Sequence, residues 1–285
     1  MHLLTRAHFN QGATAKSFSD DHSFLWVSAA QHDAANTQVQ LSGSSNAPRK
    51  PSGLSGIEAI RSKASGRRSM RCPGARSGQG IAWDGLSRFD LSRYNPWYFE
   101  RHKQFARRAA EKGFLILYNL YNTHDVLEIG PHWIDFPWRP ANNINDTGLP
   151  EPPPFKPHNR NDVGNEFYST TYAPLRELHR AYMLHTFDEL ADQPNIIFEM
   201  AYQYADPLEF EQFFQDVARE WEAKHGKHIR IALTTSKQTT DAILADPLRS
   251  KQIAIVDMRY WEYRPDGSLF APRRRKSRLS RADHQ

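Results

Sequence analysis

The chain has 285 residues, and its content of 39% hydrophobic and 12% aromatic residues is enough to bury at least one core. Its single cysteine, Cys72, excludes an internal disulfide and a zinc site built from several cysteines. No run approaches 18 apolar residues, so we expect no membrane-spanning segment and no membrane partner.

The net charge of +5 is unevenly distributed along the chain. Residues 1–78 carry 10 Lys and Arg against 4 Asp and Glu, residues 79–258 carry 19 against 25, and residues 259–285 carry 8 against 3. The basic run at 273–278, "RRRKSR", could bind nucleic acid. We expect a solvated tail and no nucleic-acid partner, because the acidic middle of the chain would repel phosphates.

Residues 1–78 are rich in Ser, Gly, Pro and Arg and poor in large apolar side chains, so we expect them to be poorly ordered. Their short apolar run, "SFLWVSAA", follows Asp20 and Asp21 and is not a convincing signal peptide, which leaves the cytoplasm as the default location. The change in composition predicts a folded domain over 79–272 and a basic disordered tail over 273–285.

Helical and strand-like segments alternate from residue 95 onward. Asn95 and Pro96 suit the N-cap and first position of a helix, and Gly113 and Gly226 each follow a helix end. The predicted order is helix 95–113, strand 114–121, helix 175–191, a strand from 195, helix 207–226, strand 229–235, helix 240–250 and strand 253–261. Such alternation implies a parallel sheet with right-handed crossovers. Four strands are legible and four to six are expected, so the fold is an incomplete (β/α)8 barrel or an open α/β sheet.

The stretch "NIIFEMAYQYADP", residues 195–207, predicts a buried strand ending in polar residues, with Asp206 capping the next helix. Alternation places Glu199 and Gln203 on one face, the expected barrel interior. Glu199 could be catalytic if the strand ends early; the alternative is an interior carboxylate paired with Arg or His. Gln203, at the rim, can bind or orient a ligand but cannot donate a proton as a general acid.

The last strand carries a second candidate carboxylate, Asp257, near its end, where it could act in catalysis or bind a substrate. A structural pair with Arg259 is the alternative. Tyr260 and Trp261 follow and could stack on sugar rings.

The loop over 122–165 is dense in aromatic, Pro and Asn residues, and a long ordered loop is commonly functional. Trp faces stack on sugars while Asn, Arg and His bind hydroxyl groups. The candidate substrate-binding residues are therefore His124, Glu128, His132, Trp133, Trp138, Arg139, Asn142 and Asn143. The alternative is that the loop covers the barrel mouth. A metal site from His124, Asp125, His132 and Asp135 lacks a tight ligand motif, so we expect no metal and no cofactor.

Four long phrases resemble DUF6298, a bacterial family of uncharacterised proteins. They are "ARSGQGIAWDGLSRFDLSRYNPWYFERHKQFA" (75–106), "VLEIGPHWIDFPWRPANNINDTGLPEPPP" (126–154), "PLRELHRAYMLHTFDELADQPNII" (174–197) and "RYWEYRPDGSLFAP" (259–272). The family resembles (β/α)8 glycoside hydrolases of the cellulase-like clan. The resemblance implies a barrel that acts on or binds a complex polysaccharide.

The chain departs from the family pattern at the site. Gln203 stands where the family's fourth-strand phrase has Glu, and the clan's nucleophile comes from a seventh strand, whereas the legible pattern stops after the sixth, as in a truncated copy. If the protein is an active glycosidase, Asp257, Glu199 or Glu128 must supply acid and base, and Gln203→Glu should raise activity. The alternatives are a non-catalytic carbohydrate-binding barrel, with Trp133, Trp138, Tyr260 and Trp261 as stacking platforms, and a degenerate fragment without activity. The sugar and the oligomeric state stay open.

Overall fold

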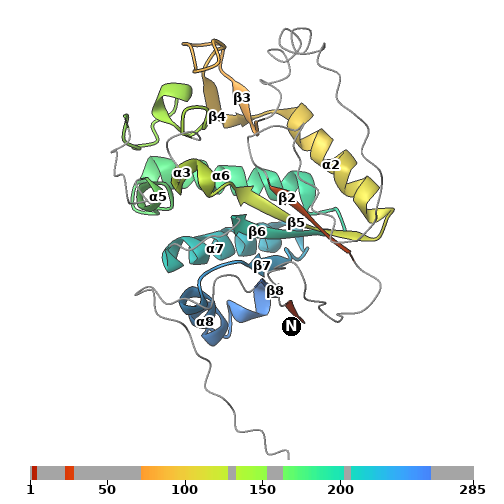
Figure 1. The fold of residues 1–285 in the computed structure, drawn as a ribbon. Coiled ribbons are helices and arrows are strands. Elements are labelled where there is room, and N and C mark those ends of the chain that lie inside the picture. Colours follow the sequence, from red (N-terminus) through yellow and green to blue (C-terminus); the bar gives the residue numbers. More distant parts are fainter. Residues whose placement is uncertain are drawn as a thin grey trace, which may run out of the picture.

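The computed structural model describes residues 2–4, 23–28, 72–127, 133–152, 163–201 and 207–257. For the first two ranges, and for His124 and Leu127, only the backbone is described. These residues form a six-stranded sheet covered by helices, and a separate two-stranded hairpin (Figure 1).

All neighbouring strands of the large sheet are parallel, as the alternation predicted. From one edge to the other the strands are β2 (Ser23–Ser28), β5 (Phe114–Tyr121), β6 (Ile196–Ala201), β7 (Ile231–Leu233), β8 (Ile253–Asp257) and β1 (His2–Leu4). In chain order, β5, β6, β7 and β8 each lie beside the preceding strand of this sheet, starting from β2, and β1 lies beside β8. Within the described residues the two edge strands, β1 and β2, do not pair with each other, so the sheet is open and no closed barrel is present.

Four helices cover the sheet: α2 (Pro96–Ala110), α6 (Ala173–Leu190), α7 (Leu208–His225) and α8 (Lys237–Ala245). The predicted cap of α2 is confirmed, because the Asn95 side chain accepts a hydrogen bond from the backbone nitrogen of Trp97 at 3.2 Å. Gly226 adopts a left-handed conformation (φ +65°) and ends α7. Two starts differ from prediction: Pro207 is the N-cap of α7 rather than its first residue, and α8 begins at Lys237, capped by Ser236.

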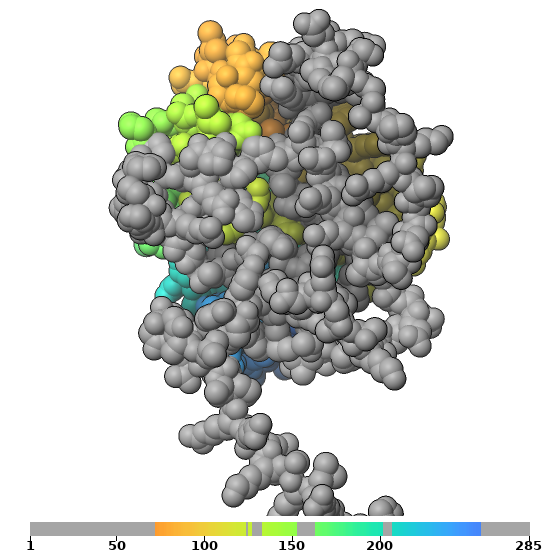
Figure 2. Space-filling view, in the orientation of Figure 1, coloured from red at the N-terminus to blue at the C-terminus, as the bar shows by residue number. Residues whose placement is uncertain are grey.

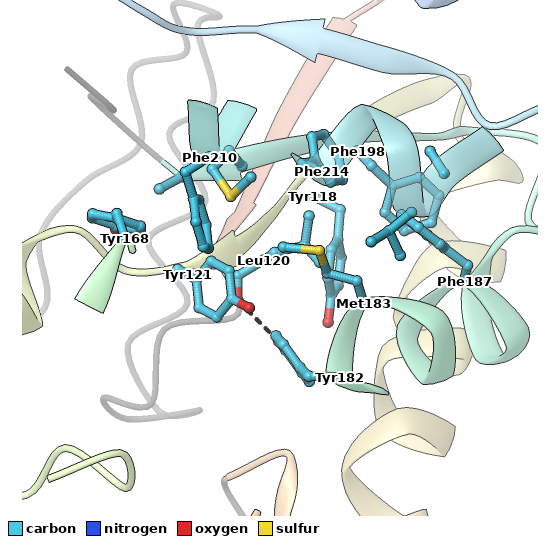
Figure 3. Close-up of a cluster of buried hydrophobic side chains, with 14 of the residues drawn as sticks. Tyr118, Leu120, Tyr121, Tyr168, Tyr182, Met183, Phe187, Phe198, Phe210 and Phe214 are labelled. Atoms are coloured by element: carbon cyan, nitrogen blue, oxygen red, sulfur yellow. Dashed lines mark hydrogen bonds between the residues drawn. The ribbon is translucent and has the colours of Figure 1, made fainter. Parts of the chain in front are cut away.

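The larger hydrophobic core lies between the sheet and the helices (Figure 3). Tyr118 and Phe198 point from neighbouring strands and meet edge to face, with ring centroids 5.8 Å apart. Phe187 of α6 packs on Phe198 at 5.1 Å in the same way. The hydroxyl of Tyr182 donates to the carbonyl of Leu120 at 2.9 Å, so this deeply placed polar group is bonded.

The opposite face of the sheet, called here the inner face, carries a smaller cluster of strand residues: Leu117, Ile197, Ala232 and Ile255. Ile196 and Phe198, the neighbours of Ile197 along β6, belong to the helix-packed core instead. The predicted alternation of β6 is therefore confirmed for these residues.

The region preceding α2 holds more structure than composition predicted. β1 and β2, both within residues 1–78, are strands of the large sheet. β3 (Gly74–Arg76) pairs with β4 (Phe89–Tyr94) as an antiparallel hairpin, so folded structure begins before residue 79. Tyr94 stacks on His185 of α6 at 4.0 Å, which holds the hairpin against the helical layer.

The segment predicted as a long loop contains short helical turns: α3 (His124–Leu127), η1 (Pro140–Asn142) and α5 (Gly164–Phe167). A further turn, η2 (Ser250–Gln252), leads into β8. In the part of the chain that is described, no helix has the length and apolar character needed to cross a membrane.

Candidate functional site

Polar side chains lie on the inner face near the carboxyl ends of the strands. Asn119 of β5 and Glu199 of β6 are Cα partners in the parallel register, and both are buried. Two residues earlier on the same strands, Leu117 and Ile197 belong to the inner cluster. Because alternate residues share a face, Asn119 and Glu199 also belong to the inner face.

Asp257, the last residue of β8, is buried on the same face, two residues after Ile255. Ala232 pairs with Ile255 and Leu233 with Val256, so continuing this register places Asp257 beside Thr234. Phe198 pairs with Ile231, which puts Glu199 level with Ala232. The structure thus places Glu199 and Asp257 on one face, two strands apart, with Asp257 one layer nearer the carboxyl edge.

Several predicted site residues lie outside the described residues, and their roles remain predictions. They are Gln203, Glu128, His132, Tyr260 and Trp261, together with Arg259, the alternative partner of Asp257. His124 falls in α3, where only the backbone is described.

Asn142 and Asn143, predicted to bind sugar hydroxyls, donate hydrogen bonds to carbonyls within the loop. The Asn142 amide donates to the carbonyls of Ile134 (2.8 Å) and Phe136 (3.0 Å). The Asn143 amide donates to the carbonyls of Pro137 (3.0 Å) and Arg139 (2.8 Å). An asparagine amide has two hydrogens to donate, so neither side chain keeps one for a ligand.

Arg139 forms a two-pronged ion pair with Glu151, with nitrogen–oxygen distances of 2.8 and 2.9 Å. A third nitrogen of the same guanidinium donates to the carbonyl of Ile134. Both side chains of the pair are partly exposed. Arg139 therefore remains accessible from solvent at the loop surface, with its orientation fixed by Glu151.

Trp133 and Trp138 are buried in the loop. The Trp138 ring stacks on His179 of α6, with centroids 4.6 Å apart and planes 18° from parallel. A sugar could reach either indole face only after the surrounding side chains moved. Their role as stacking platforms therefore stays a prediction.

A buried hydrogen-bonded pair that was not predicted, Tyr121 and His179, lies against the Trp138 ring. Nε2 of His179 lies 2.8 Å from the carbonyl of Phe167, which can only accept, so Nε2 carries the hydrogen. Nδ1 then accepts from the hydroxyl of Tyr121 at 2.8 Å. Burial lowers the pKa of His179 to about 3, so the ring is neutral at neutral pH and its role is structural.

Among the described residues, no group of three or more His, Cys, Asp or Glu side chains could hold a metal ion. Two members of the conceivable metal set, Asp125 and Asp135, are described, and the Asn122 amide donates to Asp125 at 3.1 Å. The two histidines of that set, His124 and His132, have no described side chains.

Sequence reasoning also missed Asn119 and Trp83. Asn119 is the only polar residue in the strand "FLILYNLY" apart from tyrosines, and that exception was a usable signal. Trp83 lies in the Gly-rich turn between β3 and β4, where local composition gave no reason to select it.

The family model described as "Domain of unknown function (DUF6298)" matches residues 69–284. A comparison with curated proteins found no match. Among solved structures, the chain is similar to endo-glycoceramidase II from Rhodococcus sp. in complex with the ganglioside GM3, at 13% identity and a TM-score of 0.37. That similarity covers 77% of this chain and 51% of the other, so this chain spans about half of that structure's length.

Proposed function

The chain belongs to the DUF6298 family, and we propose that it binds a carbohydrate chain at the inner face and carboxyl edge of its parallel sheet. The observation that carries this proposal is the placement of Asn119, Glu199 and Asp257 on that face. In open and closed parallel sheets alike, ligands bind beyond the carboxyl ends of the strands.

The energetics of these side chains support a functional role. Glu199 and Asp257 are taken out of water beside an apolar cluster, and burying a carboxylate costs free energy even when it is hydrogen-bonded. Proteins break the apolar pattern of a core chiefly at functional sites. A mostly apolar surface with a few placed polar groups is also the usual composition of a small-molecule site.

Carbohydrate is the ligand class that fits this chemistry and the sequence together. The Asn119 amide can donate to and accept from hydroxyl groups, and the two carboxylates can accept from them, directly or through water. The long phrases resemble the DUF6298 family, and the resemblance of that family to glycoside hydrolases favours a sugar over other polar ligands.

A second candidate function is hydrolysis of the bound chain, favoured by the presence of two carboxyl groups on one face. Glycoside hydrolysis needs one carboxyl group as proton donor and another as base or nucleophile. On the inner face, Glu199 and Asp257 are the described carboxyl groups that could fill these roles. Gln203 cannot act as the acid, because an amide has no proton to donate as a general acid.

The test is thermal unfolding of the purified chain with and without a panel of plant and algal oligosaccharides, alongside assays for released reducing ends. We expect the midpoint to rise with at least one glycan, because a ligand that binds only the folded state stabilises it. Glu199→Gln and Asp257→Asn should abolish that rise. Glu111→Gln, which removes an exposed carboxylate after α2, is the matched control and should keep it.

Two results would decide against the proposal. One is a cooperative transition that no glycan shifts. The other is a shift that both inner-face variants retain in full. Release of reducing ends by the unaltered chain, lost in either variant, would select hydrolysis over binding alone.

A further inference from the structure

Exposed apolar side chains gather on the turn of the β3–β4 hairpin and on the loop beside it. Ile81 (73% exposed) and Trp83 (41%) lie in the turn, and Ile134 (51%) lies in the loop. The Asn142 side chain joins them, because its oxygen accepts from the backbone nitrogen of Trp83 at 3.1 Å and its amide donates to Ile134. Figure 2 shows the hairpin (orange) and the loop (light green) side by side at the surface.

The turn is held in one conformation by its own contacts. The backbone nitrogen of Ala82 donates to Leu86 at 2.7 Å. Arg76 forms an ion pair with Asp84 and lies over the Phe89 ring, 3.8 Å from its centroid. Trp83 therefore projects from a rigid base, and a ligand that packs on it would not have to order the turn.

A fixed polar pair lies beside these apolar side chains. The Arg139 guanidinium donates to the Ile134 carbonyl and to both carboxylate oxygens of Glu151. The pair is partly exposed, and it is joined to the backbone of Trp83 through the Ile134 carbonyl and the Asn142 side chain. We call Ile81, Trp83, Ile134, Arg139 and Glu151 the hairpin–loop platform.

We propose that the hairpin–loop platform holds a further sugar residue of a polysaccharide, with the indole of Trp83 stacked on the ring and the Arg139–Glu151 pair bonded to its hydroxyls. The proposal rests on the proposed function and extends it from short to long glycans. An amphipathic aromatic beside directional polar groups matches a sugar, which has apolar ring faces and polar edges.

Magnitudes favour a sugar over a protein on this surface. A stable protein interface buries about 800 Å² on each partner, far more than three partly exposed side chains can present. An exposed cluster of this kind still calls for an explanation, since apolar side chains scattered singly are the norm.

The loop that carries part of the platform begins after the carboxyl end of β5. The Trp138 ring within this loop packs against the Tyr121 ring of that strand, with ring centroids 6.1 Å apart. The platform is thus joined to the end of the sheet where the glycan is proposed to bind.

The experiment compares long and short glycans on four chains: the unaltered protein, Trp83→Ala, Trp97→Ala and Glu199→Gln. Trp97, an exposed tryptophan of α2, is outside the platform and is the matched control. Soluble xylan, glucomannan, hydroxyethyl cellulose and alginate serve as long probes in affinity electrophoresis, and their trisaccharides serve as short probes in calorimetry. Thermal unfolding confirms that each variant is folded, and sedimentation velocity records self-association.

We expect Trp83→Ala to weaken binding of one polysaccharide about tenfold or more, the size of effect typical for a central aromatic contact, and to leave its trisaccharide unaffected. Trp97→Ala should change neither. If Trp83→Ala binds every probe like the unaltered chain while Glu199→Gln does not, the platform is overturned and the proposed function stands.

The reverse pattern, with polysaccharide binding lost in Trp83→Ala and unchanged in Glu199→Gln, supports the platform and removes the inner-face site. No binding of any probe overturns both. A self-association that Trp83→Ala abolishes, without a change in glycan binding, would assign the platform to a second copy of the chain and overturn the proposal.

Discussion

The helix-packed face and the inner face of the sheet are both buried, yet they bury different chemistry. The helix-packed face is aromatic, and two of its buried polar side chains are bonded to protein partners: His179 uses both ring nitrogens, and Tyr182 bonds a backbone carbonyl. The inner face is aliphatic near Leu117 and Ile197 and then carries an amide and two carboxylates towards the carboxyl edge.

The difference shows that burial alone does not mark a functional group. His179 and Glu199 are both fully buried. Both ring nitrogens of His179 are hydrogen-bonded, one to the Tyr121 hydroxyl and one to the Phe167 carbonyl, and its low pKa keeps the ring neutral. Its role is therefore to stabilise the fold. Glu199 is distinguished by its position, on the face and near the edge where a parallel sheet receives ligands.

The largest expected effect tests whether the helix-packed face supplies most of the stability. Phe210→Ala removes a fully buried ring that contacts Tyr168 at 5.3 Å and His179 at 5.0 Å, and it should lower the free energy of unfolding by about 4 kcal/mol. Ile197→Ala on the inner face should cost about 2 kcal/mol, because the inner cluster is small. Urea denaturation measures both, and an equal or larger loss for Ile197→Ala would reverse the comparison.

A smaller effect on folding stability is expected from Glu211, a buried side chain of α7 with one carboxylate oxygen that lacks a hydrogen-bond partner among the described residues. That oxygen is Oε1. Burial raises the pKa of Glu211 to about 8, and Arg249 lowers it less. The folded state therefore holds a proton that the unfolded state releases near pH 4.5, so stability falls as pH rises from 4.5 through 8.

Glu211→Gln removes this penalty while keeping the side-chain shape. Relative to the unaltered chain, it should gain up to about 3 kcal/mol of stability between pH 4 and pH 7. Urea denaturation at both pH values measures the gain, and Glu209→Gln on the same first turn is the control. A constant difference between the two chains at both pH values would show that Glu211 does not hold its proton on folding.

Local signals in the sequence predicted most of the regular structure. The Asn95 cap, the Gly226 helix end and the alternation of Ile196, Ile197 and Phe198 follow from the chemistry of a few adjacent residues, and all three agree with the structure. Ala201, predicted on the inner face, belongs to the helix-packed core instead. The starts of α7 and α8 were misplaced by one to three residues, because several residues near each start can serve as a cap.

The parts that depend on distant contacts could not be predicted in this way. β1 and β2 are short and lie in a polar region, and they become strands by pairing with β8 and β5. The roles of Asn142 and Trp83 depend on each other across 59 residues of chain. Residue type indicated that asparagine could bind hydroxyls, and only the fold shows that its hydrogens are already donated to carbonyls.

The smallest of the three expected effects is a loss of folding stability at acidic pH that comes from His179, on the helix-packed face. His179 has a pKa of about 3 in the folded state against about 6.5 when unfolded, so below pH 6.5 the unfolded state binds a proton that the folded state refuses. Stability should therefore fall as pH drops from 6.5 toward 3, by about 2 kcal/mol at pH 5 from this group. His179→Gln keeps a group that can donate to the Phe167 carbonyl and one that can accept from Tyr121, and it should flatten this slope in urea denaturation at pH 7 and pH 5. An unchanged slope in His179→Gln would mean that the acid sensitivity arises elsewhere, and the inner-face carboxylates would then be the groups to titrate next.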